Sequence, residues 1–379
     1  MRIVFNEIKK VFGLRTIIML LIISTIVYYL FISYYVKYFP GGRPDKDYNK
    51  ICAQMIKDYG TSMDDKEFEN FKDIYSKQVE EADKFLQSRP EFVKAGITTY
   101  EKFKSISLDN SDTHKLVDKV IFEENRDIFW ELQTREGIIS DYERIQSRID
   151  TSGLSENFAQ RFNEMSEGGS NKSIFPWFVL ENYDSIIYGV TIIIVLSLLF
   201  AISPIYIRDK NNKVNYIQYT TKTGRKVFKS KLTAALFSSF IIMTVYLAAV
   251  FTLYSHNKTG IYMNSSLDSF VNGPKFWYNM TFRQYIVLTV AGIYIIGFAL
   301  TLIGAFVSRV APNYITIVGI QILILFVIIK LCSEILLTHF AAAKYPKFLQ
   351  PMVYIILVLA GVISIALRMK KEKAVDIVC

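Results

Sequence analysis

The chain has 379 residues and a formal net charge of +9, and 51% of its residues are hydrophobic. The charge is divided by position: residues 39–184 hold 20 Lys and Arg against 29 Asp and Glu, whereas the rest of the chain holds 24 against only 6. The acidic block lies between two long apolar runs, and four more apolar runs follow it, which excludes an ordinary soluble protein. The sequence predicts an all-α integral membrane protein with one large polar domain.

A short amphipathic helix is expected first, over residues 1–15. Its apolar and charged side chains recur at helical spacing: Ile3, Val4, Ile8, Val11 and Phe12 against Arg2, Glu7, Lys9 and Lys10. Such a helix is suited to lie in the inner membrane interface. The same residues also fit an ordinary positive flank of a span, and this alternative stays open.

Six runs are long and apolar enough to cross about 30 Å of hydrocarbon. The predicted spans are 16–39, 185–207, 232–254, 285–307, 315–337 and 352–368. The last is the shortest, and Lys347 and Arg368 flank it, so their charged ends can reach the two interfaces. The first is expected to be a retained anchor, because Phe39-Pro40-Gly41 is not a small-x-small cleavage site.

Basic residues in the short loops predict the orientation. With the N-terminus inside, the inner segments hold 17 Lys and Arg and the outer short loops hold 5. The positive-inside rule then places both termini, including the tail 369–379, in the cytoplasm. The block 40–184 is expected to be extracytoplasmic, in a multi-pass protein of a bacterial plasma membrane.

The polar block carries helical patterns of its own. Thr61 or Ser62 is expected to cap a helix that ends near Leu86, and a second pattern covers roughly 111–148. Residues 166–174 are interpreted as a linker into the second span. About 120 residues suffice to bury a small core, so a helical extracytoplasmic domain between the first two spans is predicted.

Motifs for catalysis and metal binding are absent from the sequence. It contains no G-x-x-x-x-G-K-[ST], H-E-x-x-H or G-x-S-x-G. Its cysteines and histidines lack disulfide or ligand spacing: Cys52, Cys332, Cys379, His114, His256 and His339. We therefore expect a non-enzyme without a catalytic residue, metal or cofactor of its own.

Charged residues are scarce inside the predicted spans. Glu334 is the acidic residue at membrane depth, and Lys330 lies four positions before it on the same helix face. Carriers driven by protons or sodium place carboxylates at this depth, so any transport here is expected to be powered from elsewhere. Mutual neutralisation of Lys330 and Glu334 is the simpler interpretation, and a contact with substrate, gate or partner subunit is the alternative.

Small residues share one face of the fourth predicted span. They are Gly297, Thr301, Gly304 and Ala305. Small residues let helix backbones approach closely in membranes, so this face is expected to pack against another helix. The signal is general, because small residues are common in spans.

The basic loop 208–231 between the second and third spans is the most specific segment. Residues 212–219 are expected to form a short helix that exposes Tyr216 and Ile217, and Gly224 breaks the chain before Arg225. An exposed apolar knob among cations suits docking into an acidic groove of a cytosolic partner. A loop that only fixes topology and touches anionic lipid is the alternative.

The run Tyr219-Thr220-Thr221-Lys222-Thr223-Gly224-Arg225-Lys226, followed by Lys229-Ser230-Lys231-Leu232, resembles the inner loop of ABC-2 type permeases. These are the membrane subunits of ATP-binding-cassette exporters. Asp209 stands where that family usually has Glu. The layout of one span, a large outer domain and five further spans is also similar.

The resemblance implies a membrane subunit that pairs with a second permease, identical or different, and seats on a separate cytosolic ATPase that binds ATP and Mg. The expected cargo is amphipathic or hydrophobic, such as an antimicrobial peptide or a lipid-like compound. The residues expected to couple to the ATPase are Asp209, Tyr216, Ile217, Tyr219, Thr220, Thr221, Gly224, Arg225 and Lys226. A non-transporting receptor or assembly factor with a ligand-binding outer domain is the alternative, and no nucleic-acid partner is expected.

Overall fold

The structure is a computed structural model that describes residues 2–106, 111–124, 126–146, 156–212, 224–273, 275–338 and 340–374. These residues form helices and loops, with three isolated β-bridges among them. They divide into two compact units. The bundle unit comprises Met1–Phe39, Glu181–Lys258 and Arg283–Cys379, and the polar unit comprises Pro40–Leu180 and Thr259–Phe282.

The described residues include six helical segments that are long and apolar enough to cross a membrane. They contain α2 (Leu14–Val27) with α3 (Ser33–Lys37), α11 (Trp177–Ile202) with α12 (Pro204–Asn211), α14 (Val227–Tyr254), α15 (Phe282–Val310), α16 (Tyr314–Leu331) and α17 (Leu349–Ala374). Wider π-helical turns follow α2 at Tyr28–Ile32 and α16 at Cys332–Leu336. The length and composition of these helices are those of a multi-pass membrane protein, as the sequence predicted.

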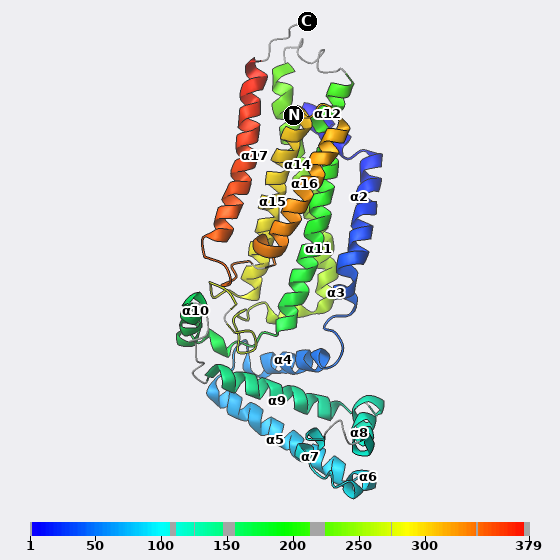
Figure 1. Cartoon of the computed structure of the whole chain (residues 1–379), viewed down its shortest axis with the longest axis vertical. Helices are drawn as coiled ribbons and strands as arrows, with labels where there is room; N and C mark the ends of the chain where they lie inside the picture. The colour runs from blue at the N-terminus through cyan, green and yellow to red at the C-terminus, as the bar shows by residue number, and fades with distance from the viewer. Residues whose placement is uncertain are drawn as a thin grey trace. The chain divides into compact units, whose positions relative to one another are not determined.

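The long helices of the bundle unit run side by side, and α1 (Arg2–Val11) packs on α14 (Figure 1). The end of α17 lies at the same end of the bundle as α1 and α12 (Figure 1). An even number of crossings returns the chain to the side from which it started. The predicted last span, 352–368, lies within α17, which runs from Leu349 to Ala374.

Burial separates a central helix from outer ones. In α11 the apolar stretch is 78% buried, whereas in the segments of α2, α16 and α17 the buried share is 17%, 17% and 11%. Leu14 and Ile315 are 75% and 84% exposed. In water such apolar surface would be unfavourable, but in hydrocarbon it is the normal surface of a spanning helix.

The polar unit is built of shorter, polar helices. They are α4 (Asp45–Tyr59), α5 (Asp65–Gln87), α6 (Pro90–Lys94), α7 (Tyr100–Lys104), α8 (Ser111–Asp118), α9 (Asp127–Gln146) and α10 (Glu156–Glu167). A reciprocal capping box begins α5: the Glu67 N–H donates to Asp64 Oδ1 (2.8 Å), and the Asp64 N–H donates to Glu67 Oε2 (2.7 Å). The cap is therefore Asp64 and not Thr61 or Ser62, because only Asp64 has a glutamate three residues later.

An aromatic core holds these helices together. Phe103 stacks on Phe129 with ring centroids 4.5 Å apart, and Phe68 stacks on Tyr142 at 4.2 Å. Further buried members of the larger cluster are Ala82, Leu86, Phe92, Ile97, Tyr100, Val120 and Leu132. The predicted helical domain thus exists as a unit with its own core.

The expected linker at 166–174 is wrong, because this segment is ordered and partly buried. The Met63 N–H donates to the Lys172 carbonyl and the Ile174 N–H donates to the Thr61 carbonyl, each at 2.9 Å. Ile174 is completely buried. Residues 166–171 are polar, and this composition predicted a linker. The residues that follow them, Lys172 and Ile174, pair with a segment about 110 positions earlier.

The segment Thr259–Phe282 lies between the third and fourth predicted spans, in what the sequence predicted as a short outer loop, and it packs as part of the polar unit. Arg161 on α10 forms an ion pair with Asp268, with 2.7 Å between Nη2 and Oδ2. The Arg161 Nε–H also donates to the Phe276 carbonyl at 2.7 Å, and the Asp268 side chain is fully buried. This buried pair joins two parts of the unit that are far apart in sequence.

Candidate functional site

The two stems of loop 208–231 form the candidate site. The structure describes the loop at 208–212 and 224–231. The predicted contact residues Tyr216, Ile217, Tyr219, Thr220 and Thr221 lie outside the described residues. The stems themselves are held by an arrangement of polar side chains at one end of the bundle unit.

The first stem begins at a break after α11. Ser203 separates α11 from α12, and Pro204 occupies the first helical position, where its missing N–H is tolerated. Ser308 Oγ on α15 accepts hydrogen bonds from the N–H groups of Tyr206 (3.1 Å) and Ile207 (3.3 Å). These donors at the start of α12 are satisfied by a neighbouring helix, so α12 is fixed to the end of α15.

The second stem is attached directly to the first. The Tyr206 hydroxyl donates to the Phe228 carbonyl at 2.8 Å, and the two rings stack with centroids 5.0 Å apart. Lys231 Nζ donates to the Ile205 carbonyl at 2.8 Å. The chain therefore leaves α12 and re-enters α14 at fixed neighbouring positions.

Four charged residues, here called the stem cluster, join both stems to the N-terminal helix: Glu7, Lys10, Asp209 and Lys231. The Lys231 ammonium pairs with Asp209 and lies 3.6 Å from Glu7 Oε2, and Lys10 Nζ lies 2.6 Å from Glu7 Oε1. The side chains of Lys231, Glu7 and Asp209 are only 3%, 9% and 10% exposed. A buried charge is tolerated only when it is paired, so each partner depends on the others.

Asp209 is the predicted coupling residue whose side chain the structure places in the stem cluster. Its carboxylate pairs with the Lys231 ammonium, and its side chain is only 10% exposed. Within the described residues, Asp209 therefore holds the loop stem in place. Any influence of Asp209 on a cytosolic partner would pass through that positioning.

The N-terminal helix is anchored by its charge. Glu7 and Val11 are buried, whereas Ile3 and Phe5 are 38% and 57% exposed. The amphipathic helix predicted for the N-terminus is present as α1. Its exposed apolar side chains are those that an interfacial helix offers to lipid.

The remaining predicted loop residues lie at the start of α14. Gly224–Lys226 form a 3₁₀ turn that leads into the helix, with Gly224 buried and Lys226 exposed. The side chain of Arg225 lies outside what the structure describes. This turn ends five residues before Lys231, so the motif residues Gly224 and Lys226 lie close in sequence to the anchored stem.

Lys330 and Glu334 lie on the surface of the bundle unit. Their Nζ and Oε1 atoms are 2.9 Å apart, and the Lys330 side chain is 74% exposed. The Tyr345 hydroxyl also donates to Glu334 Oε2 at 3.3 Å. The pair is neutralised within the chain, and its exposure leaves it accessible from the surroundings.

The small-residue face of α15 packs within the chain. A side-chain carbon added at Gly297 would overlap the sulfur of Met243 on α14 and lie 3.2 Å from Leu198 Cδ1 on α11. Thr301 donates to Ser239 Oγ at 2.6 Å, and Ala305 is fully buried. At Gly304 an added carbon would meet nothing within 4 Å.

A second ion cluster lies on α15 and α17. Arg309 Nε and Arg368 Nη2 each lie 2.7 Å from Glu372 Oε1. The sequence placed Glu372 in a polar tail, where charge alone gives no sign of a partner. Its distance from Arg309 in the chain explains why local pattern could not find this contact.

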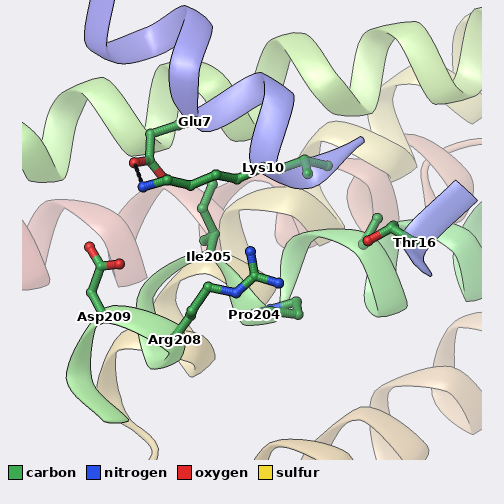
Figure 2. Close-up of a pocket in the computed structure, with 9 residues that line it drawn as sticks. Glu7, Lys10, Thr16, Pro204, Ile205, Arg208 and Asp209 are labelled. Atoms are coloured by element: carbon green, nitrogen blue, oxygen red, sulfur yellow. Dashed lines mark hydrogen bonds and ion pairs between the residues drawn. The ribbon is translucent and has the colours of Figure 1, made fainter. Parts of the chain in front are cut away.

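A recess lies beside the stem cluster, where α1, α2, the end of α11 and α12 meet (Figure 2). Its free volume is about 350 Å³ including the open solvent at its mouth. Residues that line it include Glu7, Lys10, Thr16, Pro204, Arg208 and Asp209. Only a small part of this volume is enclosed, and the recess is open on one side.

In its described residues, the site consists of hydrogen bonds and ion pairs that hold the two loop stems in place. Among the described residues no three His, Cys, Asp or Glu side chains are grouped to hold a metal ion. Comparison of the chain with family models, curated proteins and solved structures finds no match.

Proposed function

We propose that the chain is the permease subunit of an ATP-binding-cassette exporter of the ABC-2 type. The observation that carries the proposal is the stem cluster, because Lys231 joins both ends of loop 208–231 to Glu7 of α1. The loop sequence 219–232, which resembles the ATPase-facing loop of that family, thus emerges from a rigid base.

A rigid base is what mechanical coupling requires. Separating a buried ion pair costs about 3–5 kcal/mol when one partner is left alone. Force applied to the loop by an ATPase would therefore move α12, the start of α14 and α1 together. A loop tethered only by flexible stems would absorb the same displacement.

The orientation in this proposal follows the 17-to-5 distribution of basic residues in the short loops. The loop and both termini face the cytoplasm, and the polar unit is extracytoplasmic. A second permease subunit completes the pathway, and the cargo is amphipathic or hydrophobic. Lys330 and Glu334 are then candidates for a contact with the partner subunit or cargo.

Association with the ATPase tests the proposal. We expect Arg225→Glu to weaken co-purification of the ATPase from native membranes by about tenfold or more, because interface energy concentrates in a few Arg and aromatic residues. The matched control is Lys213→Glu, which makes the same charge change in the same loop outside 219–232. It should retain the ATPase.

Two outcomes would count against the proposal. Equal losses for both variants would mean that the loop acts only through its total charge. Failure of the wild-type chain to co-purify with any ATPase would remove the permease function and favour the receptor alternative.

A further inference from the structure

The recess of Figure 2 has an excess of positive charge close to its wall. Two carboxylates, Glu7 and Asp209, and two cations, Lys10 and Arg208, line it. Both carboxylates are also bound by the buried Lys231 ammonium, which does not line the recess. With Lys231 the five charged residues have a net charge of +1, and this balance favours an anion.

Arg208 is the residue available to bind it. Its side chain is exposed and has no hydrogen-bond or ion-pair partner among the described residues. It extends from α12 toward the N-terminal helices (Figure 2). A guanidinium presents two parallel N–H donors, a geometry that matches phosphate oxygens. Lys10 on α1, with its side chain half exposed, and Thr16 on α2 supply further donors at the recess wall.

The surroundings of the recess are apolar. Beside Thr16 on α2, the side chains of Leu14, Ile17, Ile18 and Leu21 are 75%, 40%, 48% and 61% exposed. This surface belongs to a helix whose length and hydropathy fit a membrane span. A free phosphate or a nucleotide would leave it unused, whereas the acyl chains of a lipid would cover it.

We propose that the recess binds the phosphate of a phospholipid with a net negative headgroup. Arg208 donates hydrogen bonds to the phosphate oxygens, and Lys10 and Thr16 provide the remaining donors. The acyl chains lie along α2. The recess is open on one side, which fits a headgroup whose bulk remains outside. The bound lipid would connect α1 and α2 to α12, next to the stem cluster. This proposal does not depend on transport.

Binding of fluorescent phosphatidylglycerol to the full-length protein in neutral detergent tests it. We expect unlabelled phosphatidylglycerol to displace the probe, while phosphatidylcholine and millimolar inorganic phosphate do not. Arg208→Gln should weaken phosphatidylglycerol binding about tenfold or more, since hydrogen bonds to charged groups are the strong ones. Arg208→Lys should restore part of the affinity, because it keeps the charge without the two parallel donors.

Lys229→Gln is the matched control. Lys229 is exposed at the start of α14 and does not line the recess, and its loss removes the same charge. Diffuse attraction between basic residues and anionic lipid predicts equal losses for the Lys229 and Arg208 variants, and that result would overturn the proposal. Displacement by inorganic phosphate as effective as by lipid would overturn the lipid assignment. Unchanged thermal unfolding of Arg208→Gln without lipid shows that the variant is folded.

Discussion

The bundle unit and the polar unit use opposite rules for their surfaces. In the bundle unit, large apolar side chains such as Leu323 and Phe326 are 68% and 70% exposed. In the polar unit, aromatic residues such as Phe71 and Phe92 are buried at 1% exposure, and charged residues cover the helices. The same chain is therefore divided between two solvents, hydrocarbon and water.

The two units place their buried charges differently as well. In the bundle unit the buried ion pairs of Lys231 and Glu372 lie at one end of the helices, next to a loop or chain end. In the polar unit the Arg161–Asp268 pair holds together segments distant in sequence. A buried pair in the first unit fixes the geometry of a loop, whereas in the second it completes a small core.

The largest expected effect is in the labelling of introduced cysteines by a reagent that cannot cross the membrane, because each cysteine should react either fully or not at all. In a cysteine-free background, we expect a thiol at Ser62→Cys to react with an impermeant maleimide in intact cells and one at Lys226→Cys to remain unlabelled until the membrane is opened. A separate variant that keeps Cys52 as its single cysteine is the unreactive control, because Cys52 is fully buried and burial raises the pKa of its thiol above the ordinary 9.0. Labelling at Lys226→Cys from outside would reverse the predicted orientation.

The next largest effect is expected inside the polar unit. Arg161→Ala leaves the fully buried Asp268 carboxylate without its ion-pair partner, which should destabilise this unit by about 3–5 kcal/mol. Hydrogen exchange of the full-length protein should show faster exchange in peptides of the polar unit and little change in α11 or α14.

Arg144→Ala is the control, since the Arg144–Asp141 pair is 64% exposed on the arginine side and lies within one helix turn. It should change the stability by less than about 1 kcal/mol. Similar effects of the two substitutions would contradict the role assigned to the buried pair.

The smallest effect concerns a surface charge of the polar unit. The Lys172 ammonium, 2.7 Å from Asp65 Oδ1, holds the pKa of that carboxyl below its ordinary 3.8. A lowered folded-state pKa stabilises the fold above pH of about 4, and the contribution is lost as pH falls through the folded value. Lys172→Gln should cost less than about 1 kcal/mol at pH 7, because Asp65 is 83% exposed.

Thermal unfolding of wild type and Lys172→Gln as a function of pH measures this contribution. The difference between them should shrink as pH falls below about 4. A difference that grows in acid would mean that Lys172 acts through packing rather than through the Asp65 charge.

The sequence was sufficient for the six spans because length and apolar composition alone define a membrane helix. It did not predict how far a helix continues beyond the end of a span. The expected last span ended at Arg368, but α17 continues through Glu372, whose carboxylate is bound by Arg309 and Arg368. A charged segment there continues a helix because its charges have partners on a neighbouring helix.

Long-range contacts explain the rest of what the sequence could not predict. Glu7 has the pattern of a polar residue on an interfacial helix, and its burial depends on Lys231, more than 200 residues later. Likewise, nothing in the local pattern of 259–282 indicates Arg161 as the partner of Asp268. Local periodicity predicts which face of a helix is apolar, but it does not predict which distant charge will meet it.

The residues of the stem cluster are synthesised at different times. Ribosomes make Glu7 near the beginning and Lys231 only after the first two spans and the part of the polar unit between them, Pro40–Leu180. Until then the carboxylate of Glu7 has a nearby companion in Lys10, three residues along the same helix. The nascent N-terminal helix can therefore lie at the membrane surface with its acid neutralised by Lys10. The arrival of the third span adds Lys231 as a second, buried partner of Glu7, while the contact with Lys10 is kept.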